Sequence, residues 1–336
     1  MIKRRLSSIL ITYAIISCAN SIKFYSVQAE HAPQSGAECV IEVKSGRILY
    51  EYRGDIRLPM ASTTKIATAI TVLENCENVK TSLSIPPETV GVEGSSVYLQ
   101  AGETYSVEDL LYGLMLRSGN DCAETLAYFF GGVGGFTAKM NYIAQKAGAF
   151  NTNFRNPHGL PCDGHYTTAI DLSLITTYAL RNSLFRVIVS TKYYEPRKWQ
   201  NKNKMLLQYE GAIGVKTGYT KQAGRCLVSA ASRKGMELVC TVLNCPQTYE
   251  RSTKLLDDAF EAYSYETIVN NGDVFECEGI KGAIHETVAY PLMDGEREAL
   301  ETRILPINSP QNGKIVGQIQ ISLAKRLIFS GNLYKL

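Results

Sequence analysis

Ser62 and Lys65 place a hydroxyl group and an amine three residues apart in the run from residue 60 to residue 70. The residues from Ile66 onward are mostly apolar and contain few helix breakers, so the run predicts a helix, on which positions i and i+3 are neighbours. Ser62 would lie in the first turn, where the positive end of the helix dipole favours a developing negative charge. The pair therefore predicts a serine prepared to attack a carbonyl.

The spacing alone is weak evidence, because a second Ser-x-x-Lys occurs at Ser322 and Lys325. That copy lies in an alternating stretch near the C terminus. In a strand, residues i and i+3 point to opposite faces. We therefore expect the second copy to be surface residues without a shared role.

Two later elements single out the first copy, namely Ser118-Gly-Asn120 and Lys216-Thr-Gly218. Each has a decoy, Ser330-Gly-Asn332 and Lys44-Ser-Gly46, that occurs in the wrong order relative to either Ser-x-x-Lys. Both decoys are predicted to be hairpin turns between alternating apolar segments. Only one set of the three motifs occurs in the expected order, with suitable spacing and in segments whose predicted secondary structure fits the motifs.

The N terminus predicts an export signal, with basic residues 3–5, an apolar stretch at 6–16 and a small-residue cleavage site at Val27-Gln-Ala29. Cleavage after Ala29 is the first choice, which makes 1–29 a signal peptide. Lipidation at Cys18 and a retained N-terminal anchor stay open, although a membrane span needs roughly 20 apolar residues. We expect an exported protein in the cell wall or on the outer face of the cytoplasmic membrane.

The formal net charge of +3 comes largely from this segment, which holds four basic residues and no acidic one. Without it, 31 Lys and Arg face 32 Asp and Glu, a net charge of −1. Nothing in this balance suggests nucleic acid as a partner.

The nine cysteines would normally suggest disulfides in an exported protein. Their spacing is irregular, and four lie in apolar runs that predict small core residues: Cys76, Cys122, Cys226 and Cys240. A disulfide between Cys240 and Cys245 is the less favoured alternative. No Cys or His cluster has the spacing of a metal site, so we expect neither metal nor cofactor.

Periodicity predicts a strand hairpin at 39–51, helices at 107–117, 123–130, 170–181 and 250–263, and strands at 214–218, 225–231 and 238–243. These elements describe an α/β fold in which a sheet built from both chain ends is sandwiched by helices, with a helical region inserted. Past about residue 266 the sequence pattern changes to short segments of alternating apolar and polar residues. We therefore predict a small all-β domain at residues 266–336. We assign 30–265 to the catalytic domain, and expect His285 to be a surface or satisfied core residue.

The ordered motifs resemble those of the low-molecular-mass penicillin-binding proteins, specifically the serine D-alanyl-D-alanine carboxypeptidases. The matching segments are 59–65, 94–96, 116–121, 156–160, 165–171 and 216–224. The resemblance covers nearly the whole exported chain and implies a penicillin-binding/β-lactamase-like catalytic fold. It also implies a peptidoglycan stem peptide ending in D-Ala-D-Ala as substrate, and β-lactams as covalent inhibitors.

Five residues are predicted to be catalytic. Ser62 is the nucleophile, and Lys65 is its base if burial or a neighbouring cation lowers the amine pKa from about 10.4. Lys216 offers that neighbouring charge. By resemblance, Ser118 relays a proton to the leaving D-alanine amine, and Asn120 positions Lys65 and the substrate amide.

Substrate binding is predicted at Thr217, Gly218, Tyr219 and Arg251. The backbone N–H groups of Ser62 and Tyr219 are the expected oxyanion donors by resemblance. Thr217 and Arg251 would hold the substrate carboxylate, because a guanidinium fork matches carboxylate geometry. The alternative for Arg251 is a solvated charge at a helix end.

Other enzyme classes fit the residues less well. A Ser-His-Asp triad with His158 or His165 and Asp171 is disfavoured, because Lys65 already supplies a base; both histidines are expected to be scaffold residues. A class A β-lactamase needs a glutamate that activates a deacylating water, and the corresponding region carries Asn156-Pro-His-Gly instead. A murein endopeptidase of the same fold and a penicillin sensor that stays acylated remain alternatives.

The pattern of the C-terminal residues 326–336 predicts a hairpin strand, whereas relatives often end in an amphipathic helix that lies on the membrane. Membrane attachment would then have to come from the N terminus. The choice between a vegetative and a sporulation role stays open.

Overall fold

The computed structural model describes residues 35–277, 279–307 and 315–336. The predicted signal peptide with its cleavage site at Ala29, and the alternatives of lipidation at Cys18 or a retained anchor, lie outside the described residues. Within the described part of the chain, no helix combines the length and the apolar character needed to cross a membrane.

A five-stranded antiparallel sheet forms the centre of the catalytic part, in the order β2-β1-β9-β8-β7. Its strands come from both ends of that part: β1 (Ala37–Glu42), β2 (Ile48–Tyr52), β7 (Ala212–Thr220), β8 (Gly224–Arg233) and β9 (Met236–Leu243). The turn at residues 44–46 joins β1 to β2, as predicted. The sheet prediction is thus confirmed.

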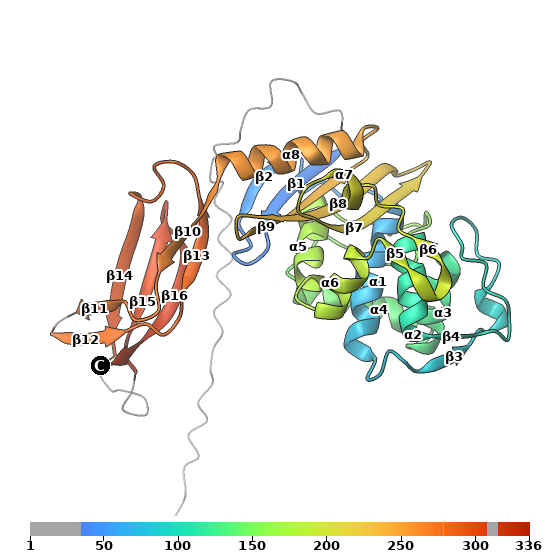
Figure 1. The fold of residues 1–336 in the computed structure, drawn as a ribbon, viewed down its shortest axis with the longest axis horizontal. Coiled ribbons are helices and arrows are strands. Elements are labelled where there is room, and N and C mark those ends of the chain that lie inside the picture. Colours follow the sequence, from blue (N-terminus) through green and yellow to red (C-terminus); the bar gives the residue numbers. More distant parts are fainter. Residues whose placement is uncertain (1–34, 278, 308–314) are drawn as a thin grey trace, which may run out of the picture.

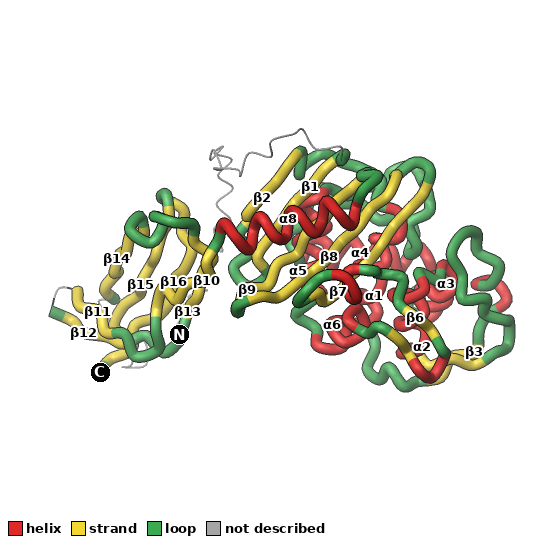
Figure 2. The backbone as a smooth tube through the Cα atoms, turned by 45° about the horizontal axis from the view of Figure 1, so that its top comes forward, coloured by secondary structure: helices red, strands yellow, loops and turns green. Residues whose placement is uncertain are grey.

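The two faces of this sheet are covered differently (Figure 1, Figure 2). One face packs against α8 (Thr248–Ala262) and the short helix α7 (Met205–Gln208), and the other against α5 (Ala169–Ala179) and the other helices of the helical region. Because side chains alternate along a strand, Val239 of β9 enters the helical core while Leu238 and Cys240 face α8.

The helical region between β2 and β7 contains η1 (Ala61–Thr64), α1 (Lys65–Asn75), α2 (Val107–Tyr112), the π-helical turn η3 (Gly113–Arg117), α3 (Asn120–Phe129), α4 (Gly132–Lys146), α5, α6 (Ser183–Ser190) and α7 (Met205–Gln208). Short segments complete it: β3 (Ser82–Ser84), η2 (Pro87–Thr89), β4 (Thr104–Ser106), β5 (Tyr193–Tyr194), η4 (Glu195–Arg197) and β6 (Trp199–Gln200). Ser106 and Asp109 form a capping box that starts α2. The helix predicted at 107–117 is therefore present, but its second half widens into a π turn.

The C-terminal strands form the predicted all-β domain. A five-stranded sheet has the order β11-β12-β16-β15-β14, and β10 pairs with β13. The bounds are β10 (Ser264–Val269), β11 (Val274–Cys277), β12 (Ile280–Ala283), β13 (Val288–Leu292), β14 (Leu300–Pro306), β15 (Ile315–Leu323) and β16 (Arg326–Lys335). The decoy Ser330-Gly-Asn332 lies inside β16, so its prediction as a hairpin turn is wrong: the ladder with β15 continues through it.

One arginine links the two parts. Arg47 donates to both carboxylate oxygens of Glu296 at 2.8 and 2.6 Å and to the carbonyl of Pro291 at 2.6 Å. Its guanidinium also lies over the rings of Tyr263 and Tyr290. The hairpin that precedes the nucleophile helix is thereby tied to the C-terminal domain.

Cysteines behave mainly as core residues among the described residues. Cys122, Cys226 and Cys240 are buried free thiols, whereas Cys76 is half-buried. Cys240 and Cys245 are both free, so the disulfide considered for them does not form. Burial raises the pKa of the Cys226 thiol to about 11, which keeps it protonated.

Candidate active site

Ser62 and Lys65 meet because the chain enters α1 through a tight turn. Ser62 lies in the 3₁₀ turn η1, and Lys65 is the first residue of α1, so the predicted first helical turn is 3₁₀ rather than α. The Lys65 backbone N–H bonds to the carbonyls of Ser62 and Thr63. This geometry brings Lys65 Nζ to 3.0 Å from Ser62 Oγ.

Asn120 reaches the same amine from α3. The π turn η3 ends at Ser118, which adopts a left-handed conformation with φ of 65° and is buried. This reversal lets α3 start at Asn120, whose Oδ1 lies 2.7 Å from Lys65 Nζ. Asn120 Nδ2 in turn donates to the carbonyl of Glu93.

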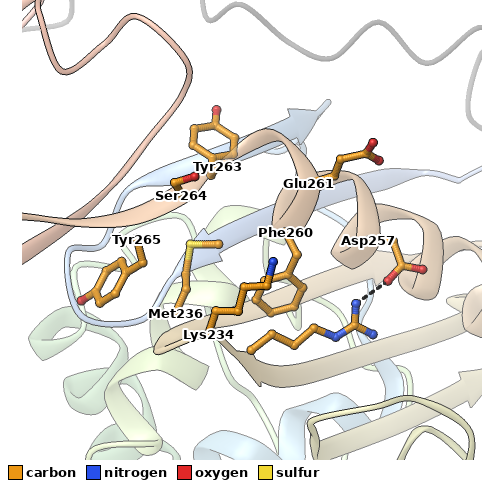
Figure 3. Close-up of a pocket in the computed structure, with 9 residues that line it drawn as sticks. Lys234, Met236, Asp257, Phe260, Glu261, Tyr263, Ser264 and Tyr265 are labelled. Atoms are coloured by element: carbon orange, nitrogen blue, oxygen red, sulfur yellow. Dashed lines mark hydrogen bonds and ion pairs between the residues drawn. The ribbon is translucent and has the colours of Figure 1, made fainter.

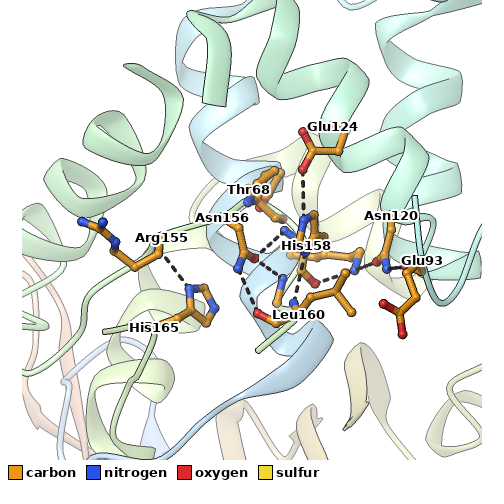
Figure 4. A network of polar contacts seen from close by, with 12 residues as sticks. Thr68, Glu93, Asn120, Glu124, Arg155, Asn156, His158, Leu160 and His165 are labelled. Atoms are coloured by element: carbon orange, nitrogen blue, oxygen red, sulfur yellow. Dashed lines mark hydrogen bonds and ion pairs between the residues drawn. The ribbon is translucent and has the colours of Figure 1, made fainter. Parts of the chain in front are cut away.

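The loop 155–160 supplies the third acceptor. Arg155, Asn156, His158 and Leu160 of this loop are labelled in Figure 4. The carbonyl of His158 lies 2.7 Å from Lys65 Nζ. The loop packs closely on η1: Gly159 has φ of +91°, and a Cβ there would lie 1.9 Å from the Ala61 carbonyl oxygen. Only glycine fits at this point of contact. The Asn-Pro-His-Gly sequence thus places a carbonyl beside the Lys65 amine.

Strand β7 closes the site from the other side. Lys216 is buried, and its Nζ donates to the carbonyl of Thr217 at 2.9 Å. A Cβ on Gly218 would lie 3.2 Å from the backbone nitrogen of Ser62, so the strand runs directly against η1. Thr217 is half-buried, and Tyr219 is 64% exposed. The structure therefore brings the three sequence motifs together.

Electrostatics at this site favour a neutral amine. Burial, and next the positive charge of Lys216, lower the pKa of Lys65 well below its ordinary value. Burial and the charge of Lys202 lower the pKa of Lys216 to about 7. Among the described residues, neither lysine has a carboxylate within ion-pair distance. Asp121 and Cys122 of α3 raise the pKa of Lys65, but burial and the charge of Lys216 outweigh them. A neutral Lys65 can accept the proton of Ser62.

Arg251 does not join this group, which corrects the prediction that it binds the substrate carboxylate. It lies on α8 and donates to both carboxylate oxygens of Glu38 at 2.7 and 2.6 Å, and to Tyr50 Oη at 3.1 Å. Glu38 is fully buried on the face of the sheet that α8 covers. The guanidinium fork is already occupied by a structural carboxylate, and the solvated-charge alternative is also wrong.

Lys202 is the cation near the site that the motifs missed. Its backbone N–H donates to the carbonyl of Leu116 at 3.1 Å, beside the turn that ends at Ser118. Its charge lowers the pKa of both Lys65 and Lys216. The polar run Asn201-Lys202-Asn203 matches no known motif, so the sequence offered no reason to select Lys202. Only the backbone contact of this segment with η3 shows that the lysine lies near the site.

The histidines are scaffold residues in this structure. His165 Nδ1 accepts from the Arg155 N–H at 3.0 Å, and its Nε2 lies 2.9 Å from Thr64 Oγ1. Burial lowers the pKa of His165 to about 4, so the ring is neutral. Asp171 accepts from the Asn151 N–H and from Thr152 instead of a histidine. The disfavoured Ser-His-Asp triad is not assembled.

A pocket of about 650 Å³ lies elsewhere, between the β8–β9 turn, the end of α8 and the start of β10 (Figure 3). Arg233, Lys234, Phe260 and Tyr265 are among its lining residues. None of the predicted catalytic or substrate-binding residues lines it, so we do not connect it with the reaction.

The family model for D-alanyl-D-alanine carboxypeptidases, peptidase family S11, matches residues 25–247. The chain belongs to this family. It is a serine-type D-alanyl-D-alanine carboxypeptidase and a penicillin-binding protein.

Known relatives agree with this assignment. D-alanyl-D-alanine carboxypeptidase DacF of Bacillus subtilis (strain 168) is 32% identical over 281 residues, which cover 78% of this chain and 72% of the relative. A D-alanyl-D-alanine carboxypeptidase of Streptomyces sp. (strain K15) is 36% identical over 243 residues, 64% of this chain and 84% of the relative. The crystal structure of penicillin-binding protein 5 from Haemophilus influenzae superposes with a TM-score of 0.77 at 25% identity, covering 91% of this chain and 97% of that chain.

Proposed function

We propose that this carboxypeptidase removes the terminal D-alanine from peptidoglycan pentapeptides through an acyl-enzyme on Ser62, and that β-lactams trap the same serine. The observation that carries the proposal is the 3.0 Å approach of Lys65 Nζ to Ser62 Oγ in a site that lowers the lysine pKa. A buried neutral amine is a competent general base.

In the acylation step, Ser62 Oγ attacks the carbonyl carbon of the penultimate D-alanine while its proton passes to Lys65. The tetrahedral oxyanion accepts from the N–H groups of Ser62 and Tyr219. The C–N bond then breaks, and the leaving D-alanine amine takes up the proton through Ser118. Water hydrolyses the ester, with Lys65 again as base, and regenerates Ser62.

The substrate carboxylate is assigned to Thr217 and Lys202, in place of Arg251. Lys202 lies close enough to the two catalytic lysines to lower their pKa values. The substrate is a polymer outside the cytoplasmic membrane, so we also propose an exported protein.

Mass spectrometry of a purified muropeptide pentapeptide tests the assignment. The wild-type protein should release free D-alanine, and Ser62→Ala should lower the rate by at least about 10³-fold. A fluorescent penicillin should label the wild type and not Ser62→Ala. Absence of D-alanine release would overturn the carboxypeptidase proposal, and undiminished release by Ser62→Ala would overturn the nucleophile.

Two further measurements separate the remaining alternatives. Faster cleavage of cross-linked than of monomeric muropeptides would identify an endopeptidase. A label that never leaves Ser62, without D-alanine release, would identify a penicillin sensor.

A further inference from the structure

Glu124 and His158 form a polar pair beside the catalytic amine that the proposed mechanism does not use. Glu124 Oε1 lies 3.0 Å from His158 Nε2, and both side chains are largely buried. The Leu160 N–H donates to His158 Nδ1 at 3.1 Å (Figure 4). Because Nδ1 is an acceptor, the ring proton lies on Nε2 and is donated to the Glu124 carboxylate. The imidazole is thus held at both nitrogens.

The backbone of the same histidine contacts Lys65. The His158 carbonyl oxygen lies 2.7 Å from Lys65 Nζ. The contact of Glu124 with the imidazole therefore holds the carbonyl that the amine meets, because side chain and carbonyl share one residue in a tight loop.

Helix α3 is linked to Lys65 at two points, directly through Asn120 and indirectly through the contact of Glu124 with His158. Asn120 contacts the amine directly through Oδ1 at 2.7 Å, and Glu124 lies four residues later on the same helix face. One rigid element thereby sets the positions of both non-serine acceptors. Their relative placement is fixed by the helix rather than by two independent loops.

Two fixed acceptors have a stereochemical consequence for a neutral amine. Its nitrogen carries two N–H bonds and one lone pair, arranged tetrahedrally with Cε. When Asn120 Oδ1 and His158 O accept the two N–H bonds, the lone pair points at the third neighbour, Ser62 Oγ at 3.0 Å. That is the direction required to take the serine proton.

We propose that Glu124 is a positioning residue, which holds the His158 carbonyl so that the lone pair of Lys65 faces Ser62. The proposal rests on the proposed function, in which Lys65 is the base for Ser62. The groups whose charges act on Lys65 are Lys216 of β7, Lys202, and Asp121 and Cys122 of α3. Glu124 meets His158 and not the amine itself, so the proposed effect is on orientation.

The test measures labelling of the full chain by a fluorescent penicillin across pH 6–10. Glu124→Leu should lower the maximal acylation rate by about 10- to 100-fold, the usual cost of a misplaced catalytic group. The midpoint of the pH profile and the fraction of molecules labelled at completion should stay unchanged. Glu124→Gln keeps an acceptor for His158 Nε2 and should stay within about 3-fold of wild type.

Glu108→Leu is the matched control, since Glu108 has nearly the same exposure as Glu124, 18% against 19%, and is also paired with a basic residue, Lys80. It should acylate at the wild-type rate. An unchanged rate in Glu124→Leu, or a slow rate explained by fewer labelled molecules, would overturn the proposal. Failure of the wild type to be labelled, or labelling of Ser62→Ala, would instead overturn the proposed function.

Discussion

Buried cations on the two faces of the central sheet have different partners, and their pKa values shift in opposite directions. On the helical side, Lys65 and Lys216 are buried with no carboxylate partner among the described residues, and their pKa values are lowered. On the α8 side, Arg251 donates to both oxygens of Glu38, and this pairing raises its pKa.

The difference shows how one fold lowers the pKa of one buried cation and keeps another charged in an ion pair. A buried cation with a bidentate carboxylate remains charged and holds two elements together. A buried amine that meets only neutral acceptors and other cations tends to lose its proton. The partner, more than the residue type, decides which of the two a cation becomes.

The largest expected effect is on the helical face. Lys65→Met and Lys65→Arg should both lower the penicillin acylation rate by about 10³-fold, because methionine has no base and a guanidinium does not deprotonate. Stopped-flow labelling measures this rate. Wild-type acylation by the arginine variant would contradict the assignment of Lys65 as a base.

On the other face the same kind of change should affect stability alone. Arg251→Met leaves the Glu38 carboxylate buried and unpaired, so the free energy of unfolding should fall by about 3–5 kcal/mol. Urea denaturation measures the loss, and the folded fraction should still acylate at the wild-type rate.

Two controls accompany the Arg251 prediction. Adding Glu38→Gln should recover part of the stability. Lys254→Met, which removes an exposed ion pair with Asp258 on the same helix, should cost less than about 1 kcal/mol. A slow-acylating but stable Arg251→Met would show that the arginine does bind substrate.

Stability should also depend on pH through Lys216. Its pKa is about 7 in the folded protein and about 10.5 when unfolded, so the unfolded chain binds more protons between these values. Raising the pH from 7 to 8.5 should therefore stabilise the wild type relative to Lys216→Met, by about 1 kcal/mol per pH unit. Urea midpoints at three pH values give the slope. An equal slope in both proteins would mean that Lys216 stays protonated.

The smallest expected effect concerns the substrate carboxylate. Lys202→Met should raise KM for a D-Ala-D-Ala peptide by about 10-fold and change kcat less, because the lost contact is to a part of the substrate that does not react. Lys204→Met is the neighbouring control. With a peptide whose C terminus is amidated, the 10-fold difference in KM should disappear. A difference in KM that persists would show that Lys202 acts only through the pKa of Lys65 and Lys216 and does not bind the carboxylate.

The local pattern of apolar and polar residues was sufficient to predict most of the helices and strands of the catalytic part. Alternation identified β1, β2 and the strands from β7 to β9, because side chains facing two different cores must alternate. Helical periodicity identified α5 and α8. It could not show that residues 113–117 widen into a π turn, since that depends on how the chain reverses at Ser118 and starts α3 with Asn120 beside Lys65.

The order of the motifs likewise indicated which residues form the candidate site, but it did not identify every residue that lies near that site. Ser62, Lys65, Ser118, Asn120 and Lys216 were predicted from spacing and resemblance, and the structure brings their motifs to one site. Arg251 was predicted from its guanidinium fork and from a position at a helix start that resembles that of the family's carboxylate-binding arginine. Its partner Glu38 lies more than 200 residues earlier, so sequence distance hid the ion pair that occupies it.

The sequence by itself determined the chemistry: a serine, a lysine three residues later, and two further motifs in the only workable order. Tertiary structure alone decided which cations act. Burial and contact with partners distant in the chain set whether a lysine loses its proton, and these depend on packing that no local pattern records. For that reason the pKa of Lys65 is lowered, Arg251 forms a structural ion pair, and Lys202 lies near the site.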